Sequence, residues 1–88
     1  LFLVLTRPNE AGRARLGLAV GIKAAGNAVK RNRIKRLARE SFRDRQHELP
    51  ALDVGVNARP AATTSSSAEI RASLQAHWDR IVRRCARS

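Results

Sequence analysis

Residues 26–45 carry the sequence GNAVKRNRIKRLARESFRDR, and the rest of the chain can be interpreted around this stretch. It contains no proline, few β-branched residues and many arginine, lysine, leucine and alanine residues, a composition that favours an α-helix. Asn27 can cap the start of this helix, because its side-chain oxygen can accept a backbone N–H one turn further on. Pro50 predicts that the helix ends at about Glu48.

With about 100° between successive residues, this helix has two distinct faces. One face is an apolar stripe suited to a core, formed by Ile34, Leu37, Ala38, Ser41 and Phe42. Roughly opposite lies a ridge of hydrogen-bond donors that contains no acidic residue, formed by Asn32, Lys35, Arg36, Arg39, Arg43 and Gln46. Like charges three and four residues apart repel each other in an isolated helix, so the ridge predicts a polyanionic partner. The alternative is a face that is simply solvated, and the ridge alone does not exclude it.

Charge is concentrated on the same stretch. Of the net charge of +11, residues 23–45 contribute +7, from nine basic and two acidic residues. Such clustering is typical of a nucleic-acid-binding surface. An anionic membrane surface is the competing partner, but amphipathic membrane helices usually carry many Trp, Phe and Leu residues opposite the basic face. The apolar stripe here is short, and no segment approaches the roughly 18 consecutive apolar residues of a membrane span.

The size and the single cysteine restrict the architecture. A chain of 88 residues with 3% aromatic residues predicts one domain over residues 1–88 with a modest core. Cys85 is the only cysteine, which excludes an internal disulfide framework and fits a reducing cytosol. We therefore expect a cytoplasmic protein.

The segments around the central helix predict a sheet. Residues 1–7 are a continuous apolar run, which predicts a strand buried on both faces. Residues 15–23 and 52–58 alternate between apolar and other residues, which predicts two strands with one apolar face each. The strand–helix–strand order implies a parallel crossover, and such connections are right-handed in about 98% of cases.

The second strand has an unusual outer face. Gly17, Ala19 and Gly21 form a floor of small residues between Arg15 and Lys23. Such a floor would either let a helix pack closely or admit a nucleic-acid strand, and the sequence leaves both readings open.

The C-terminal third predicts a loop and a helix. Residues 60–67 are polar and are expected to form a mobile loop. Ser66 followed by Glu69 has the pattern of a capping box that opens the last helix. The apolar stripe of that helix is formed by Ile70, Leu74, His77, Trp78, Ile81 and Cys85.

No part of the sequence predicts a protein catalytic or metal site. The seven acidic residues are scattered and mostly lie beside arginines, whereas two-metal phosphodiester cleavage needs converging carboxylates. One cysteine and two distant histidines are too few for a zinc site, and His47 and His77 fit structural roles better than an acid–base pair. The few aromatic residues argue against a base-stacking platform.

The order of residues in the central stretch resembles a known signature. GNAV at 26–29 is followed by RNRIKR at 31–36, by Arg39-Glu40 and Phe42-Arg43, and then by RQHELP at 45–50. This pattern closely resembles the protein subunit of bacterial ribonuclease P, and looser similarity covers nearly the whole chain. The resemblance implies a small α/β sandwich of the α+β type, with a mostly antiparallel sheet, two helices and a βαβ crossover around the central helix. In that family the crossover is left-handed, against the general rule.

The resemblance also implies a function. The chain is expected to bind the catalytic ribonuclease P RNA and to assist Mg²⁺-dependent removal of the 5′ leader from precursor tRNA. The RNA would perform the chemistry and hold the Mg²⁺, so the protein itself would bind no cofactor, no small-molecule substrate and no membrane. The expected RNA contacts are Lys23, Arg31, Asn32, Arg33, Lys35, Arg36, Arg39 and Arg43. The expected leader cleft involves Gly17, Ala19, Gly21 and Asn57.

Three points stay open at this stage. Arg31 lies nearer the apolar side of the helix, so it is alternatively a partner in a structural ion pair. Family members usually begin with a basic segment, a helix bearing aromatic residues and an additional strand, so we expect an N-terminally shortened form whose leader cleft lacks one wall. A structural RNA-binding protein of ribosomal type is the alternative function.

Overall fold

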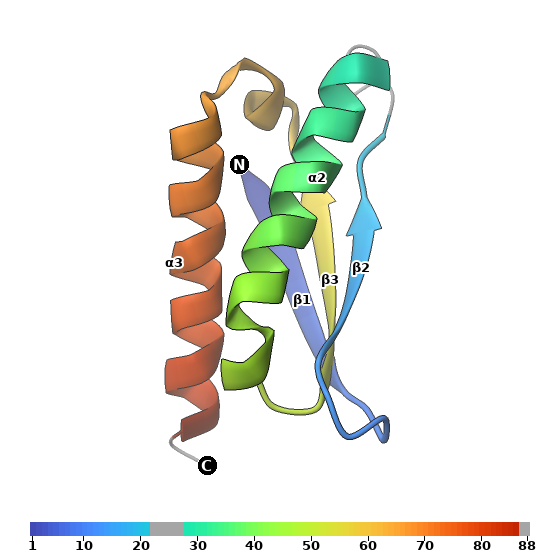
Figure 1. The fold of residues 1–88 in the computed structure, drawn as a ribbon, viewed down its shortest axis with the longest axis vertical. Helices are drawn as coiled ribbons and strands as arrows, with labels where there is room; N and C mark the ends of the chain where they lie inside the picture. Colours follow the sequence, from blue (N-terminus) through green and yellow to red (C-terminus); the bar gives the residue numbers. More distant parts are fainter. Residues whose placement is uncertain (22–27, 87–88) are drawn as a thin grey trace.

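The computed structural model describes residues 1–21 and 28–86, and in these the chain forms one sheet with two helices. The elements in chain order are β1 (Phe2–Pro8), β2 (Arg15–Ala19), α2 (Ala28–Arg45), a 3₁₀ turn (Gln46–Glu48), β3 (Leu52–Ala58), a second 3₁₀ turn (Pro60–Thr64) and α3 (Ser67–Ala86). Helices α2 and α3 lie side by side on one face of the sheet, α3 at the β1 side and α2 at the β2 side (Figure 1). Within the described residues, neither helix is both long and apolar enough to cross a lipid bilayer.

The strand order is β1-β3-β2, so the last strand in the sequence is the central one. Strand β1 pairs with β3 in antiparallel fashion, whereas β2 pairs with β3 in parallel. The α+β class is therefore confirmed, but the described sheet is mixed rather than mostly antiparallel. In Figure 1 the chain rises along β2, descends through α2 in front of the sheet and rises again along β3 to the left of β2. This path is a left-handed crossover, as the family resemblance implied and against the general preference.

The core lies between the sheet and the helices. All five residues of the predicted α2 stripe are buried. The α3 stripe supplies Trp78, which is fully buried and packs edge-to-face against Phe42 at 5.7 Å between ring centroids. The Trp78 indole N–H donates to Ser41 Oγ at 2.8 Å, which explains how a hydroxyl is accommodated in this interior. Val54 and Val56 of β3 complete the contact from the sheet side.

Strand β1 is not buried on both faces, so that prediction was wrong. Phe2 is buried beneath the helices, but Leu3 and Leu5 on the opposite face are 42% and 59% exposed. The physical reason is that both described helices pack on the same side of the sheet, so none of the described elements covers the other side. A continuous apolar run therefore did not mean burial on two faces here.

The segment between β3 and α3 differs from the expectation in one detail and confirms it in another. Residues 60–67 are not simply an irregular loop, because Pro60–Thr64 form a 3₁₀ turn that buries Ala62. The capping box is confirmed: the Glu69 N–H donates to Ser66 Oγ at 3.1 Å, and the Ser66 N–H donates to Glu69 Oε1 at 3.0 Å. The hydrogen bond from the Ser66 backbone N–H, and after it the Ser66 hydroxyl group, hold the pKa of the Glu69 carboxyl below its ordinary value. The predicted cap at Asn27 lies outside the described residues.

Candidate nucleic-acid interface

The outer surface of α2 presents the predicted basic ridge. Asn32, Arg36, Arg39 and Arg43 are exposed, and Lys35 is half-buried. In the part of the chain that the structure describes, the four cations of this set, Lys35, Arg36, Arg39 and Arg43, make no hydrogen bond and no ion pair. Their charges are therefore not neutralised by a neighbouring carboxylate. Because residues four apart rise by about 6 Å along a helix, the ridge is a regular array of cations.

Arg33 and Arg31 differ from this ridge. Arg33 Nη2 donates hydrogen bonds to the Ser65 carbonyl at 3.1 Å and to Ser67 Oγ at 3.2 Å. These bonds connect α2 to the start of α3. Arg31 makes no ion pair within the described residues, and its buried Nε has no hydrogen-bond partner there. The sequence left a structural ion pair open for Arg31, and the described residues show none; Arg33 instead makes structural hydrogen bonds. Both remain predicted RNA contacts, and Lys23 lies outside the described residues.

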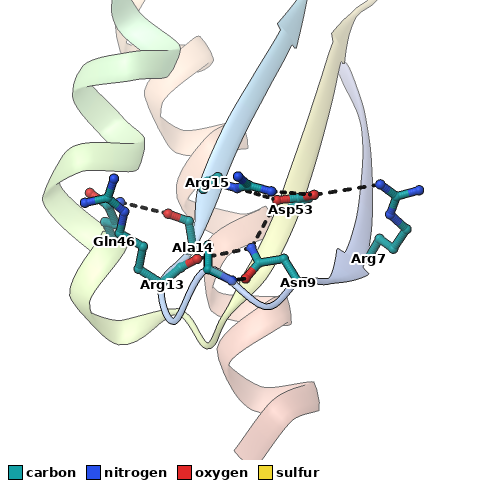
Figure 2. Close-up of polar contacts among 8 residues, drawn as sticks. Arg7, Asn9, Arg13, Ala14, Arg15, Gln46 and Asp53 are labelled. Atoms are coloured by element: carbon teal, nitrogen blue, oxygen red, sulfur yellow. Dashed lines mark hydrogen bonds and ion pairs between the residues drawn. The ribbon is translucent and has the colours of Figure 1, made fainter.

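A groove runs between the basic ridge and the edge strand β2. It has a volume of about 300 Å³ and is lined by Leu16, Leu18, Arg39, Phe42, Arg43 and Gln46. Gln46 also connects the 3₁₀ turn after α2 to the residue before β2, since its Nε2 donates a hydrogen bond to the Ala14 carbonyl at 2.8 Å (Figure 2). The groove combines an apolar floor with two arginines, a combination that suits the bases and phosphates of RNA.

The open face of the sheet is organised in rows that cross the three strands. The strand register aligns Leu5 with Gly55 and Gly17 in one row, and Leu3 with Asn57 and Ala19 in the next. A depression of about 390 Å³ lies over this face near β2, and Arg15, Gly17, Asp53 and Gly55 are among the residues that line it. The structure thus brings together three of the four predicted leader-cleft residues, Gly17, Ala19 and Asn57. Gly21 lies beyond the end of β2.

Gly55 lies in the same row as the predicted leader-cleft residue Gly17, although the sequence analysis did not single it out. Its outward direction followed from the alternation of residues 52–58, but its position beside Gly17 depends on the register between β3 and β2. Neither glycine has a positive φ; Gly12 is the glycine that does, within the described residues. An added Cβ would lie 4.0 Å from the Val54 carbonyl oxygen at Gly17 and 3.8 Å from the Leu5 carbonyl oxygen at Gly55, both ordinary contacts. Neither backbone conformation nor helix packing therefore requires these glycines, since both helices cover the opposite face.

One end of the open face carries a row of charged residues (Figure 2). Asp53 on the central strand accepts hydrogen bonds from Arg15 Nε at 2.9 Å and from Asn9 Nδ2 at 3.0 Å, and Arg7 on β1 lies 3.9 Å away. These bonds, the one from Arg15 first, lower the pKa of Asp53 from its ordinary value. Asn9 also closes the turn before β2, because its Nδ2 donates to the Arg13 carbonyl at 3.1 Å. Arg15 and Arg7 therefore both lie at the border of the open face beside a single carboxylate, that of Asp53, which balances one of their two positive charges.

The described residues contain no group of three or more His, Cys, Asp and Glu side chains positioned to hold a metal ion. Several acidic residues have other partners: Asp53 binds Arg15, Glu69 caps α3, and Asp79 binds Arg45 at 2.8 Å. The polar chemistry of these surfaces is therefore that of arginine, lysine and asparagine donors.

Comparison with known proteins agrees with this arrangement. Residues 1–82 match the family model described as Ribonuclease P. The chain is 49% identical over 85 residues to the ribonuclease P protein component of Thioalkalivibrio sulfidiphilus, covering 97% of this chain and 71% of the relative. It is 51% identical over 85 residues to the ribonuclease P protein component of Methylococcus capsulatus, covering 97% of this chain and 66% of the relative.

Solved structures share the fold. The RNase P protein of Staphylococcus aureus superposes with a TM-score of 0.83 at 41% identity, covering 91% of this chain and 72% of that chain. The RNase P protein of Thermotoga maritima superposes with a TM-score of 0.79 at 33% identity, covering 91% of this chain and 76% of that chain. The sequence thus spans between 66% and 76% of the length of these four proteins. The family match, the sequence identities and the shared fold together place this chain in the ribonuclease P protein family.

Proposed function

We propose that this chain acts as the protein component of ribonuclease P, binding the ribonuclease P RNA and assisting removal of the 5′ leader from precursor tRNA. The observation that carries this proposal is the α2 ridge, whose four cations have no carboxylate partner in the described residues. A cluster of unpaired cations on one helix face is unfavourable unless a polyanion neutralises it. The groove beside the ridge adds apolar contacts with Leu16, Leu18 and Phe42.

The protein's contribution under this proposal is electrostatic and geometric. Two RNA molecules, the catalytic RNA and the precursor tRNA, repel each other through their phosphates, and cations between them reduce that repulsion. Catalysis and the Mg²⁺ ions that it requires would belong to the RNA. The residues of this chain would hold phosphates and keep the two RNAs in register.

The leader is proposed to cross the open sheet face. The glycine row at Gly17 and Gly55 brings a ligand close to the backbone, and the exposed Leu3 and Leu5 offer apolar contact to unstacked bases. Arg15 at the border of the depression can bind a phosphate on its free side. In this arrangement the ridge and the leader face are separated by strand β2, so one RNA can contact each side.

Reconstitution with ribonuclease P RNA at low Mg²⁺ tests the proposal. The chain should restore cleavage of precursor tRNA, and its affinity for the RNA should fall with salt at a slope of log K against log salt near about −3 to −5, as for roughly four to six neutralised phosphates. An affinity that barely changes between about 0.1 and about 0.4 M salt would contradict an electrostatic interface. Copurification with ribosomal RNA, without any effect on tRNA maturation, would instead support the ribosomal alternative.

A further inference from the structure

Gln46 is the one uncharged polar residue that lines the groove between α2 and β2. It directly follows the last residue of α2, and it lines the groove together with Arg39 and Arg43, about two turns and one turn earlier. The groove lies on the helix-covered side of the sheet, at its β2 edge. Leu1 lies at the other edge, where its carbonyl accepts a hydrogen bond from the Arg59 N–H at 2.8 Å. The groove is therefore remote from the first residue of the sequence.

The side-chain amide of Gln46 is held in one orientation. Its Nε2 donates to the Ala14 carbonyl at 2.8 Å (Figure 2). A rotation of the amide by half a turn would place Oε1 against that carbonyl oxygen, and two acceptors repel each other. Oε1 accepts no hydrogen bond from the described residues, and Nε2 carries a second N–H. One acceptor and one donor, side by side, therefore remain for an occupant of the groove.

The groove combines this amide with an apolar surface and with positive charge. Leu16, Leu18 and Phe42 form the apolar part. Arg39 and Arg43 are exposed, and in the part of the chain that the structure describes they make no ion pair. Apolar side chains suit the flat face of a base, and arginines suit the phosphates on either side of it. An adjacent donor and acceptor suit the Watson–Crick edge of a base, which is accessible only when the base is unpaired.

We propose that the groove binds one unpaired nucleotide of ribonuclease P RNA, with the Watson–Crick edge of its base against the Gln46 amide. The inference rests on the proposed function and deepens it, because it names the kind of RNA element that the α2 side of the molecule recognises. An RNA double helix fits the groove less well, since pairing closes its Watson–Crick edges and leaves the apolar surface without a contact. The precursor leader is proposed to lie on the other side of the sheet, so the nucleotide belongs to the ribonuclease P RNA.

The first test compares Gln46→Met with Arg43→Ala in binding to ribonuclease P RNA. Gln46→Met keeps the length of the side chain but removes its hydrogen bonds, so affinity should fall about 3- to 10-fold while the slope of log K against log salt stays unchanged. Arg43→Ala should also weaken binding, but it removes a charge and should make the slope smaller by about 1. The control is His47→Ala, an exposed neighbour outside the groove, which should leave the affinity within about twofold. Binding is measured under conditions in which denaturant unfolding shows each variant to be folded, because Gln46→Met also loses the bond to Ala14.

The second test is chemical probing of the RNA. Dimethyl sulfate modifies the Watson–Crick edges of unpaired adenine and cytosine, and a carbodiimide reagent modifies those of uracil and guanine. The unmodified chain should protect at least one unpaired base of ribonuclease P RNA that saturating Gln46→Met protein leaves reactive. Saturating His47→Ala protein should keep this protection.

The opposite results would exclude the proposal. Identical protection by the unmodified chain and by Gln46→Met would show that no base lies against this amide. An unchanged RNA affinity of Gln46→Met, together with a lower free energy of unfolding, would limit the amide to a role in the fold. A loss of discrimination between precursor and mature tRNA would place the leader in the groove instead. In each of these cases the proposed function stands; it fails separately, if the unmodified chain does not bind ribonuclease P RNA.

Discussion

Two sets of basic side chains on the same helix behave differently. Arg33 and Arg45 are tied into the protein, the first to Ser65 and Ser67 and the second to α3 through Gln75 at 2.6 Å and Asp79 at 2.8 Å. The other set makes no such bond within the described residues and consists of Lys35, Arg36, Arg39 and Arg43. The difference teaches that position around the helix, not residue type, decides whether a cation builds the fold or is available to a polyanion.

The apolar stripe beneath both sets should show the largest effect. Leu37 is 3% exposed in the core. Leu37→Ala should lower the free energy of unfolding by about 2–4 kcal/mol, because it removes buried methyl groups and leaves a cavity. Denaturant unfolding measures this loss. Val29→Ala is the control on the same helix: Val29 is 79% exposed, so its change should stay within about 0.5 kcal/mol.

Loss of a ridge cation should affect RNA binding alone. Arg39→Ala should weaken the affinity for ribonuclease P RNA by about 1–2 kcal/mol, because a charge-assisted hydrogen bond to phosphate is lost. Its free energy of unfolding should change by less than about 0.5 kcal/mol, since Arg39 is exposed and has no partner within the described residues. Unfolding of the domain by this substitution would show that the assignment of helix faces is wrong.

Loss of a cation that is bonded to the rest of the protein should lower stability and leave RNA binding nearly unchanged. Arg45→Ala removes the bonds to Gln75 and Asp79 that hold the C-terminal end of α2 against α3. We expect about 1 kcal/mol lower stability, because these bonds are only partly shielded from water, and nearly unchanged RNA affinity. If Arg45→Ala and Arg39→Ala weakened RNA binding equally, the distinction between the two sets would not hold.

The open sheet face allows a substitution that separates stability from binding. Gly55→Ala should raise the free energy of unfolding by about 0.5 kcal/mol, because alanine loses less backbone entropy on folding and its Cβ meets no close atom. The same methyl group would stand between the face and a bound leader. Discrimination between precursor and mature tRNA should therefore fall about threefold, while affinity for ribonuclease P RNA serves as the internal control. Unaltered discrimination would place the leader elsewhere.

The smallest expected effect concerns acid stability. Arg15 and Asn9 lower the pKa of folded Asp53 relative to the unfolded chain. Their contribution is therefore complete above the unfolded value of about 3.9 and is lost as the pH falls through the lower folded pKa. Asp53→Asn should flatten this part of the curve of stability against pH, and Arg15→Ala should flatten it as well. Curves that keep the slope of the unmodified protein would show that the charged row contributes nothing to stability.

The elements of this fold could be predicted from the sequence because their periodicity is strong. The α2 stripe, the alternation of β3 and the Ser66–Glu69 capping box depend on neighbours in the chain, and all three are confirmed. The strand order and the open side of the sheet depend on packing between distant segments. A run such as residues 1–7 is apolar whether one or both faces are covered, so its exposure could not be read from the sequence.

In the candidate sites, too, features set by neighbouring residues could be predicted, whereas features set by packing between distant segments could not. Helical spacing alone placed Arg36, Arg39 and Arg43 on one exposed surface. The bonds of Arg33 depend on where the chain returns at Ser65 and Ser67, and the neighbourhood of Gly55 and Gly17 depends on the register of a parallel pairing. No local pattern encodes either relation.

The central position of β3 has a consequence for how the chain acquires its structure during synthesis. Phe2 pairs with Ala58 and Pro8 with Leu52, so within the described sheet β1 gains its partner only after β3 has been synthesised. Strand β2 pairs with the same late strand. Contacts between such distant residues slow folding, because a long loop must close before any pairing is gained. A nascent chain that ends before residue 52 can form the α2 helix but not the described sheet, so its exposed β1 residues are then a site for chaperone binding or aggregation.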